Sequence, residues 1–247
     1  MMIIASYDEE SNITHLKEKA VARGLFSELE KLKNRILLLG SMVEENVRNS
    51  MKAFKAYDDE LALQVQDKDN EIDRTEITVE EECLRILALY QPVASDLRFV
   101  VTVLKLNNDL ERIGDLASKI AKKVKIIKKD TRVNLANAIT IPEEMDEMAD
   151  NTLRLVKKSL DAFVQEDADL AYKVLIWDDE IDEAKHVIRR KLEEIQQQDP
   201  SQHIYLGILL SITRSLERIA DHGTNIAEDV IYMLQGRIIR HDQEEIS

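Results

Sequence analysis

Acidic side chains spaced four residues apart are the groups in this sequence best placed to do chemistry. Residues four apart lie on one face of a helix, so each such pair presents two carboxylates side by side. Among 48 acidic residues in 247, roughly nine such pairs arise by chance alone. Four pairs differ from the rest because they occupy matching places in two similar stretches of chain. They are Asp69 with Asp73, Glu111 with Asp115, Asp178 with Asp182, and Glu217 with Asp221.

The position of the pairs along the chain predicts that they meet in twos. If the helices that carry the first two pairs form an antiparallel hairpin turning near residue 92, the pairs lie at nearly the same height, since a helix rises about 1.5 Å per residue. A turn near residue 199 has the same effect on the other two pairs. Like charges at this spacing repel, so something positive must offset them. The neighbouring Arg112 or Arg218 could form a salt bridge, and a bound cation could take the same role.

A cation bound by these carboxylates would be an oxygen-seeking ion. Carboxylates without histidine or thiolate suit Mg²⁺, Mn²⁺, Ca²⁺ or iron and disfavour structural zinc. Along the same helix face the second copy offers Asn225 and Glu228 as possible accessory ligands, whereas the first offers Ser118, Lys119 and Lys122. Because lysines compete with a cation, we expect the second copy to bind metal more strongly or in greater number.

Catalytic motifs are sparse. A carboxylate-bridged di-iron oxidase needs Glu-x-x-His on two helices of one bundle, and only Glu183 with His186 fits that spacing. His222 follows Asp221, but one isolated histidine is more often a surface or capping residue than a ligand. The sequence has neither a G-x-S-x-G motif nor a P-loop. We therefore expect a protein that is not an enzyme, with a carboxylate-bridged metalloenzyme on a helical bundle as the alternative.

The composition indicates that helices carry all of these residues. The chain has only six Gly, three Pro and 4% aromatic residues beside 44% hydrophobic residues, which favours an all-α protein over folds rich in turns. The prolines and two weaker breaks separate six long predicted helices. Asp199 and Pro200 resemble a helix start, as does a capping box from Thr140 with Pro142 in the first turn. The predicted helices are roughly 24–56, 58–90, 94–128, 142–165, 167–198 and 201–235.

An internal repeat arranges these helices into two tandem three-helix bundles. The stretch LERIGD at residues 110–115 recurs as LERIAD at 216–221, and DNEID at 69–73 is matched by DDEID at 178–182. We expect an N-terminal extension at 1–23, a first repeat at 24–130, a second repeat at 140–235 and a C-terminal tail at 236–247.

The charge and cysteine content restrict the partners and the compartment. The net charge of −14 argues against binding to nucleic acid, because an acidic surface repels phosphate backbones. The single cysteine, Cys83, has the same helical spacing as its apolar neighbours, which predicts that it is a core residue. No stretch has the pattern of a signal peptide or the length of a membrane span, so we expect a cytoplasmic protein.

One segment departs from the acidic average. Residues 119–132 contain seven Lys or Arg and one acid. This run is typical of a helix C-terminus followed by a solvated linker. The alternative is a contact surface for an acidic partner or a lipid headgroup.

These motifs resemble those of the PhoU family of phosphate-transport regulators. The resemblance covers most of the chain, from about Phe26 to His241, and rests on four stretches in the family's order. They are GSMVEENV at 40–47, QPVASDLR at 91–98, LERIGDLASKIA at 110–121, and LERIADHGTNIAEDVIYMLQGRIIRH at 216–241.

The resemblance implies a function that the acidic pairs alone do not reveal. Proteins of this family are negative regulators of phosphate uptake and of phosphate-starvation signalling. They link the ATPase subunit of the phosphate transporter to the phosphate-sensing histidine kinase, usually as homodimers that reach the membrane only through partners. Family members carry metal ions, including iron clusters, on acidic motifs. By position these correspond to Glu111, Asp115, Glu217 and Asp221, with Asp69, Asp73, Asp178 and Asp182 as the second set.

Overall fold

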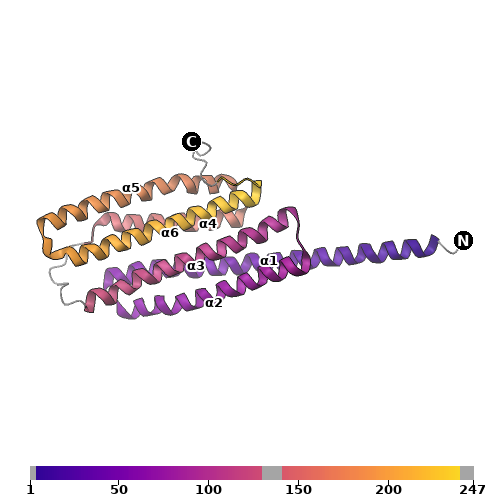
Figure 1. Cartoon of the computed structure of the whole chain (residues 1–247), viewed down its shortest axis with the longest axis horizontal. Coiled ribbons are helices and arrows are strands. Elements are labelled where there is room, and N and C mark those ends of the chain that lie inside the picture. Colours follow the sequence, from indigo (N-terminus) through magenta and orange to yellow (C-terminus); the bar gives the residue numbers. More distant parts are fainter. Residues whose placement is uncertain (1–3, 130–140, 240–247) are drawn as a thin grey trace.

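The computed structural model describes residues 4–129 and 141–239, and this part of the chain consists of long α-helices without strands (Figure 1). The helices are α1 (Ile4–Ala56), α2 (Asp59–Tyr90), α3 (Ala94–Lys129), α4 (Glu143–Gln165), α5 (Ala168–Gln198) and α6 (His203–Gln235), with a 3₁₀ turn, η2 (Pro200–Gln202), before α6. The all-α prediction is confirmed. The predicted linker at 130–140 and residues 240–247 of the predicted tail lie outside the described residues. Within the described ranges, every helix lacks the long apolar stretch that a bilayer crossing requires.

Two aspartates begin the second helix of each repeat. Asp58 Oδ1 accepts hydrogen bonds of 3.0 Å from the backbone N–H groups of Glu60 and Leu61. Asp167 Oδ1 accepts one of 3.0 Å from Leu170 N–H. Such caps satisfy backbone donors that have no partner within the helix and contribute about 1 kcal/mol each. They confirm the breaks predicted near residues 58 and 167.

The prolines lie close to the predicted helix starts. Asp199 Oδ1 accepts from Ser201 N–H at 3.0 Å, and Pro200 opens the 3₁₀ turn that precedes α6. Pro142 occupies the N-cap position of α4, outside the first turn where the sequence had placed it, and makes no side-chain capping bond. The predicted capping box from Thr140 lies outside the described residues.

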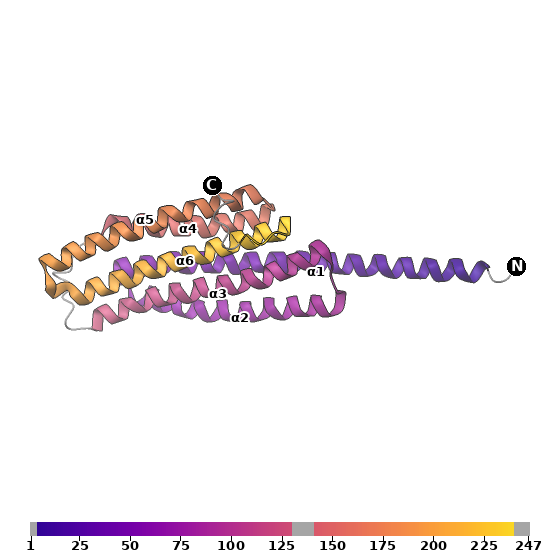
Figure 2. The ribbon, with the colours of Figure 1, turned by 45° about the horizontal axis from the view of Figure 1, so that its top comes forward.

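The first helix is longer than predicted. α1 begins at Ile4, whereas the apolar pattern had predicted a start near residue 24. Figures 1 and 2 show the additional turns projecting beyond the other helices. A loss of apolar periodicity marks the end of packing, but it does not interrupt backbone hydrogen bonding. The helix enters the bundle near Gly24, where an added Cβ would lie 3.2 Å from Tyr90 Cε1.

Within each bundle, the third helix is central and the second is peripheral. Fifteen residues of α3 and seventeen of α6 are buried, against six of α2 and five of α5. The buried side chains of α2 and α5 recur every seven residues, which leaves one narrow stripe facing the core. The sevenfold stripes are Val65, Ile72, Val79 and Ile86 in α2, and Val174, Ile181 and Ile188 in α5.

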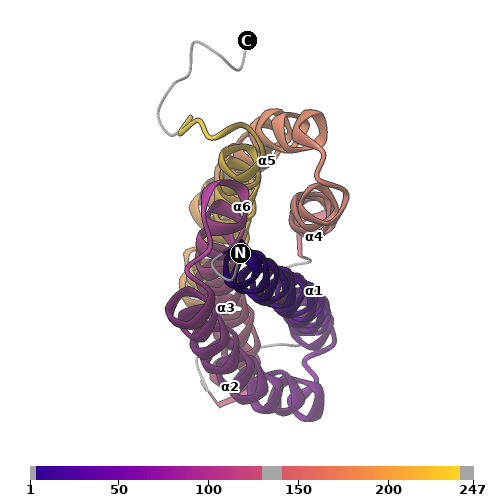
Figure 3. The same cartoon turned by 90° about the vertical axis from the view of Figure 1, so that its right-hand side faces the viewer.

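The two bundles share a single hydrophobic core. Figure 3 looks along the helices and shows α3 beside α6 at the junction. These helices are antiparallel, because Arg98 near the start of α3 donates to Met233 O near the end of α6 at 3.0 Å. α1 and α4 are antiparallel too, with ion pairs of 3.2 Å between Lys33 and Glu166 and 2.7 Å between Lys55 and Asp146.

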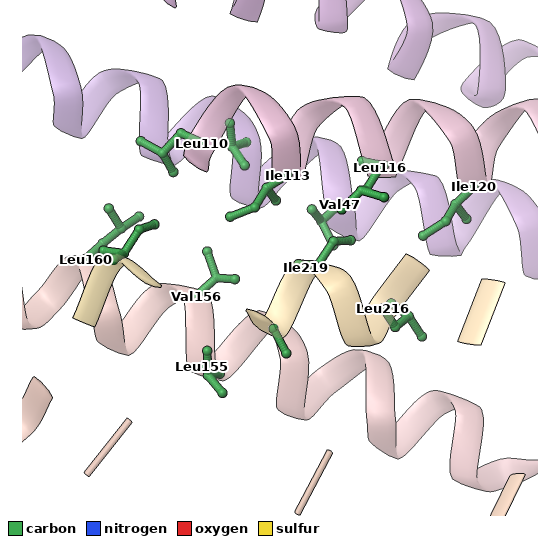
Figure 4. Packing of buried hydrophobic residues seen from close by; sticks show 14 of the residues in the cluster. Val47, Leu110, Ile113, Leu116, Ile120, Leu155, Val156, Leu160, Leu216 and Ile219 are labelled. Atoms are coloured by element: carbon green, nitrogen blue, oxygen red, sulfur yellow. The ribbon is translucent and has the colours of Figure 1, made fainter. Parts of the chain in front are cut away.

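Apolar side chains fill the space between the bundles. Figure 4 shows Val47 and Ile113 of the first bundle lying across from Val156 and Ile219 of the second. Burial of each such side chain contributes about 1.5–3 kcal/mol, so the junction is a strong constraint on the arrangement of α3 and α6. This rigid frame holds the acidic pairs of each hairpin in place.

Candidate functional site

The first carboxylate cluster lies between α2 and α3. Gly114 allows the helices to approach closely, because an added Cβ would lie 3.2 Å from Ile72 Cγ2 and 3.4 Å from Asp69 Oδ1. Desolvation raises the pKa of Asp69, and the negative charges of Asp73 and Asp115 raise it further. Desolvation also raises the pKa of Glu111, with Asp115 and Asp73 adding to the rise against the opposing effect of Arg112. The predicted meeting of these two acidic pairs is confirmed.

One buried carboxylate oxygen in this cluster has no hydrogen-bond partner in the part of the chain that the structure describes. Ser118 lies beside Asp69 and opposes the rise in its pKa. Among the described residues, however, neither Asp69 Oδ1 nor Ser118 Oγ reaches hydrogen-bond geometry with any group. A buried oxygen left without a donor is energetically costly, so this position favours a ligand that supplies positive charge.

Cations surround the edge of the first cluster. Arg112 Nε lies 3.3 Å from Glu111 Oε2, and Arg112 Nη1 lies 3.5 Å from Asp115 Oδ2. Lys119 Nζ is 3.6 Å from Asp115 Oδ2. These groups are exposed, so each pair contributes at most about 1 kcal/mol to stability. The salt bridges considered for Arg112 are therefore present at the surface of the cluster, whereas Asp69 Oδ1 inside it has no partner within the described ranges.

The second cluster lies between α5 and α6 and contains Asp178, Asp182, Glu217 and Asp221. Desolvation is the main cause that raises the pKa of Asp178 to about 6, and the charges of Asp221 and Asp182 contribute. The pKa of Asp221 is raised by desolvation and then by Glu217 and Asp182. The second acidic meeting point is thus also confirmed.

A lysine is inserted into this second cluster. Lys185 Nζ donates to Asp182 Oδ1 at 2.9 Å and to Glu217 Oε1 at 2.8 Å, and these bonds raise the pKa of the lysine above its ordinary value. The expectation of stronger metal binding in the second copy depended on Lys119 and Lys122 near the first. The structure removes that basis, because a lysine contacts two carboxylates of the second set directly.

The possible accessory ligands Asn225 and Glu228 make other contacts in the structure. Asn225 Nδ2 donates to Asp109 Oδ1 at 3.3 Å, and His222 Nδ1 lies 2.8 Å from the same oxygen. This half-buried contact joins α6 to α3 across the junction, so Asn225 is committed to Asp109. Glu228 has an interaction of its own. Residue spacing does not predict a role for Asp109, because its contact forms only where the two repeats pack together.

The remaining sequence candidates lie outside both clusters. Cys83 is fully buried, and desolvation raises the pKa of its thiol to about 12, as expected of a packed core residue. Glu183 and His186 lie on the exposed face of α5, where Glu183 is 3.7 Å from Arg190. An oxidase would require this Glu-x-x-His pair to face the bundle interior.

Both clusters supply the donor chemistry of a hard cation, with carboxylate oxygens of raised pKa and one buried orphan oxygen. In the described residues, no three His, Cys, Asp or Glu side chains converge into a set that holds an ion. Binding therefore requires the carboxylates to rotate toward one another from their present ion pairs.

Comparison with known proteins gives matches over most of the chain. The family model described as "PhoU domain" matches twice, at residues 36–124 and 145–230. The chain is 37% identical to a phosphate-specific transport system accessory protein PhoU homolog of Pseudomonas aeruginosa, covering 87% of each protein. It is 31% identical to the phosphate-specific transport system accessory protein PhoU of Escherichia coli K12, again covering 87% of each.

Two solved structures are similar to this one. The crystal structure of PhoU from Pseudomonas aeruginosa has a TM-score of 0.80 and 36% identity, covering 85% of this chain and 99% of that chain. The crystal structure of the phosphate transport system regulatory protein PhoU from Streptococcus pneumoniae has a TM-score of 0.78 and 28% identity, covering 87% and 98%. Each matched domain lies within one of the two three-helix bundles.

Proposed function

Because the chain belongs to the PhoU family, we propose that it is an accessory protein of phosphate transport that lowers phosphate uptake and phosphate-starvation signalling when phosphate is plentiful. The observation that carries this proposal is the paired match of the PhoU domain at 36–124 and 145–230. Both repeats are retained, and nearly the whole length of the relatives is covered. The names of these relatives describe accessory and regulatory proteins, which favours a non-enzymatic role.

The finer role is that of a cytoplasmic adaptor between the phosphate transporter ATPase subunit and the phosphate-sensing histidine kinase. A long acidic bundle with exposed helix faces suits simultaneous contact with two proteins. We expect the protein to act as a homodimer and to make no contact with nucleic acid, consistent with its net charge of −14.

Deletion and complementation test this role. A strain without the protein should express a phosphate-starvation reporter in high phosphate, and the intact chain should restore repression. Affinity capture in high and low phosphate should recover the transporter ATPase and the histidine kinase. Full repression in the deletion strain, or capture of neither partner in either condition, would contradict the proposal.

A metal ion at the carboxylate clusters is the second part of the proposal. In the first cluster Asp69, Asp73, Glu111 and Asp115 would hold it, and in the second Asp178, Asp182, Glu217 and Asp221. The ion, iron or alternatively Mg²⁺, Mn²⁺ or Ca²⁺, supplies positive charge that neutralises the carboxylates and links the two helices of each hairpin. The raised pKa values and the orphan Asp69 Oδ1 support this part. The linked hairpin then presents a rigid surface to the partners.

Metal binding is measured by elemental analysis and by thermal unfolding with added ion. An ion at 100 times its Kd stabilises the folded protein by about 2.7 kcal/mol, which raises the Tm of a chain this long by roughly 5–11 °C. Replacement of Glu111 by Gln and Asp115 by Asn should abolish the part of this shift that the first cluster provides. A matched control replaces the exposed Glu81 and Glu194 by Gln. Equal shifts in both variants, or full partner affinity after metal removal, would refute the metal part alone.

A further inference from the structure

The last three turns of α3 carry a one-sided row of lysines, called here the lysine ridge. It consists of Lys119, Lys122, Lys125 and Lys129 together with Ile126, all of them exposed. Their spacing of three and four residues places them along one face of the helix. No acid occurs in residues 116–129, so the ridge is a concentrated positive surface on a protein of net charge −14. Figure 1 places it at the end of the molecule opposite the projecting start of α1.

Helix-end electrostatics does not explain the lysine ridge. The dipole of a helix favours cations only within its last turn, whereas the ridge extends over three turns. The equivalent part of α6, aligned through the repeated LERI motif, is residues 225–235. That stretch contains two acids and no Lys or Arg, and α6 has no basic residue in its last turn. The fold of the repeat therefore does not require such a ridge, and the lysines are present in the first copy alone.

Ion pairs within the protein neutralise only part of the positive charge. Lys128, beside the ridge, bonds to the carboxylate of Asp59, and Lys119 approaches Asp115 at 3.6 Å. Lys125 and Lys129 form no ion pair with any described residue. Their charge is therefore available to an external anion.

Apolar side chains are exposed among these lysines. Ile126 on the ridge is 47% exposed, and Leu63 on the neighbouring α2 is 55% exposed. Leu63, Lys125, Lys128 and Lys129 line a shallow hollow of about 170 Å³ between α2 and α3. Isolated exposed apolar residues are common, but here they lie within the basic surface, as in helices that rest on membrane interfaces.

We propose that the lysine ridge docks the protein directly on an anionic lipid surface, with Ile126 and Leu63 entering the headgroup layer. Within residues 119–129 every cation is Lys and none is Arg. A flexible lysine is a non-directional point charge, whereas specific carboxylate or phosphate recognition on a macromolecule favours the fork of arginine. The described part of the ridge has no aromatic side chain on which a nucleic-acid base could stack.

This inference goes beyond the proposed function, in which the membrane is reached only through partner proteins. Direct contact with lipid would hold the adaptor at the membrane between encounters with its partners. It stands or falls independently of the adaptor role, because pure lipid vesicles contain neither partner.

Co-sedimentation of the full chain with vesicles tests the proposal. One set contains phosphatidylcholine with ~30% phosphatidylglycerol, an anionic lipid that gives the surface potential attracting basic residues. The other set contains phosphatidylcholine alone. Each lysine near such a surface increases partitioning about fivefold. Replacement of Lys122, Lys125 and Lys129 by Gln should therefore reduce partitioning on the order of 100-fold. Replacement of Ile126 by Ser should reduce it several-fold further.

The matched control replaces three exposed lysines of the second bundle, Lys157, Lys173 and Lys191, by Gln, which changes the net charge equally. We expect this variant to bind nearly as well as the wild type, and binding of the wild type to weaken in high salt. Equal binding of the wild type to both vesicle types would overturn the proposal. Equal loss in the ridge and control variants, or retained binding by the ridge variant, would overturn it as well. Circular dichroism checks that each variant remains helical.

Discussion

Asp178 connects the electrostatics of the second cluster to the stability of the whole protein. Its carboxyl is partly buried and faces the charges of Asp221 and Asp182, which together with desolvation raise its pKa from 3.8 to about 6. Asparagine has nearly the same shape and carries no charge at any pH. The Asp178→Asn variant therefore removes the charged form and leaves the packing nearly intact.

The sign of the effect follows from the raised pKa. Asp178 holds its proton more tightly in the folded protein than in the unfolded chain, so protonation favours folding at low pH. This contribution is complete below about pH 4 and is lost as the pH rises to about 6, where the folded protein must hold the charged form. A shift of about two units corresponds to about 3 kcal/mol, and partial exposure reduces this to about 2 kcal/mol. Asp178→Asn should therefore stabilise the protein by about 2 kcal/mol at pH 8 and by only about 0.7 kcal/mol at pH 4.5.

Urea denaturation in EDTA at these two pH values measures the difference. The adjacent Asp179 is exposed, so Asp179→Asn serves as a control that should change stability by less than about 0.5 kcal/mol at either pH. A gain for Asp178→Asn of equal size at both pH values, or a loss at pH 8, would refute this reasoning. With added Mn²⁺ at pH 8 the advantage of the variant should shrink, because the ion stabilises the charged cluster of the wild type.

Four further variants test glycine packing, the inserted lysine and a hydrogen bond between tyrosines. Gly223→Ala in α6 should destabilise the folded protein by about 1–3 kcal/mol in the same urea assay, since the new Cβ would lie 2.4 Å from Leu155 Cδ2. In the same helix, the Cβ of Gly207→Ala meets nothing within 4 Å, so this variant should stabilise the protein by about 0.5–1 kcal/mol. Lys185→Gln should lower stability in EDTA by about 1 kcal/mol, but it should tighten Mn²⁺ binding about tenfold by calorimetry, because the lysine no longer occupies two carboxylates. Arg189→Gln is the control. Unchanged Mn²⁺ binding by Lys185→Gln would count against a metal role for this cluster. Tyr205→Phe should cost about 1 kcal/mol by loss of the 2.7 Å hydrogen bond to Tyr57, and unaltered urea midpoints would show that this bond contributes nothing.

Helix number and most helix boundaries could be predicted from the sequence because local signals determine them. Asp199 caps the following turn as its position before Pro200 predicts, and Asp58 and Asp167 cap the helices that follow the two predicted breaks. The start of α1 could not be predicted in this way. Periodicity reports where a helix packs, and the part of α1 before Gly24 extends past the other helices (Figure 2).

The positions of the acidic residues in the candidate site could be predicted from the sequence, but the contacts of its cationic residues could not. The heights of the acidic pairs follow from helix rise and turn position, both of which are local properties. The insertion of Lys185 between Asp182 and Glu217 depends on how α5 is rotated against α6. The contact of Asp109 with His222 depends on the packing of one repeat against the other, which neither repeat encodes alone.

The antiparallel junction has an evolutionary consequence. α3 and α6 are equivalent helices of the two repeats, and so are α1 and α4, and each runs against its own counterpart. This is the geometry of a twofold-symmetric dimer whose halves have been joined into one polypeptide. In a true homodimer any substitution appears in both halves at once. The joined chain is free of that constraint, so one half could acquire the lysine ridge while the other has no Lys or Arg at the equivalent positions. Symmetry supplies the shared core, and covalent linkage permits the two outer surfaces to specialise.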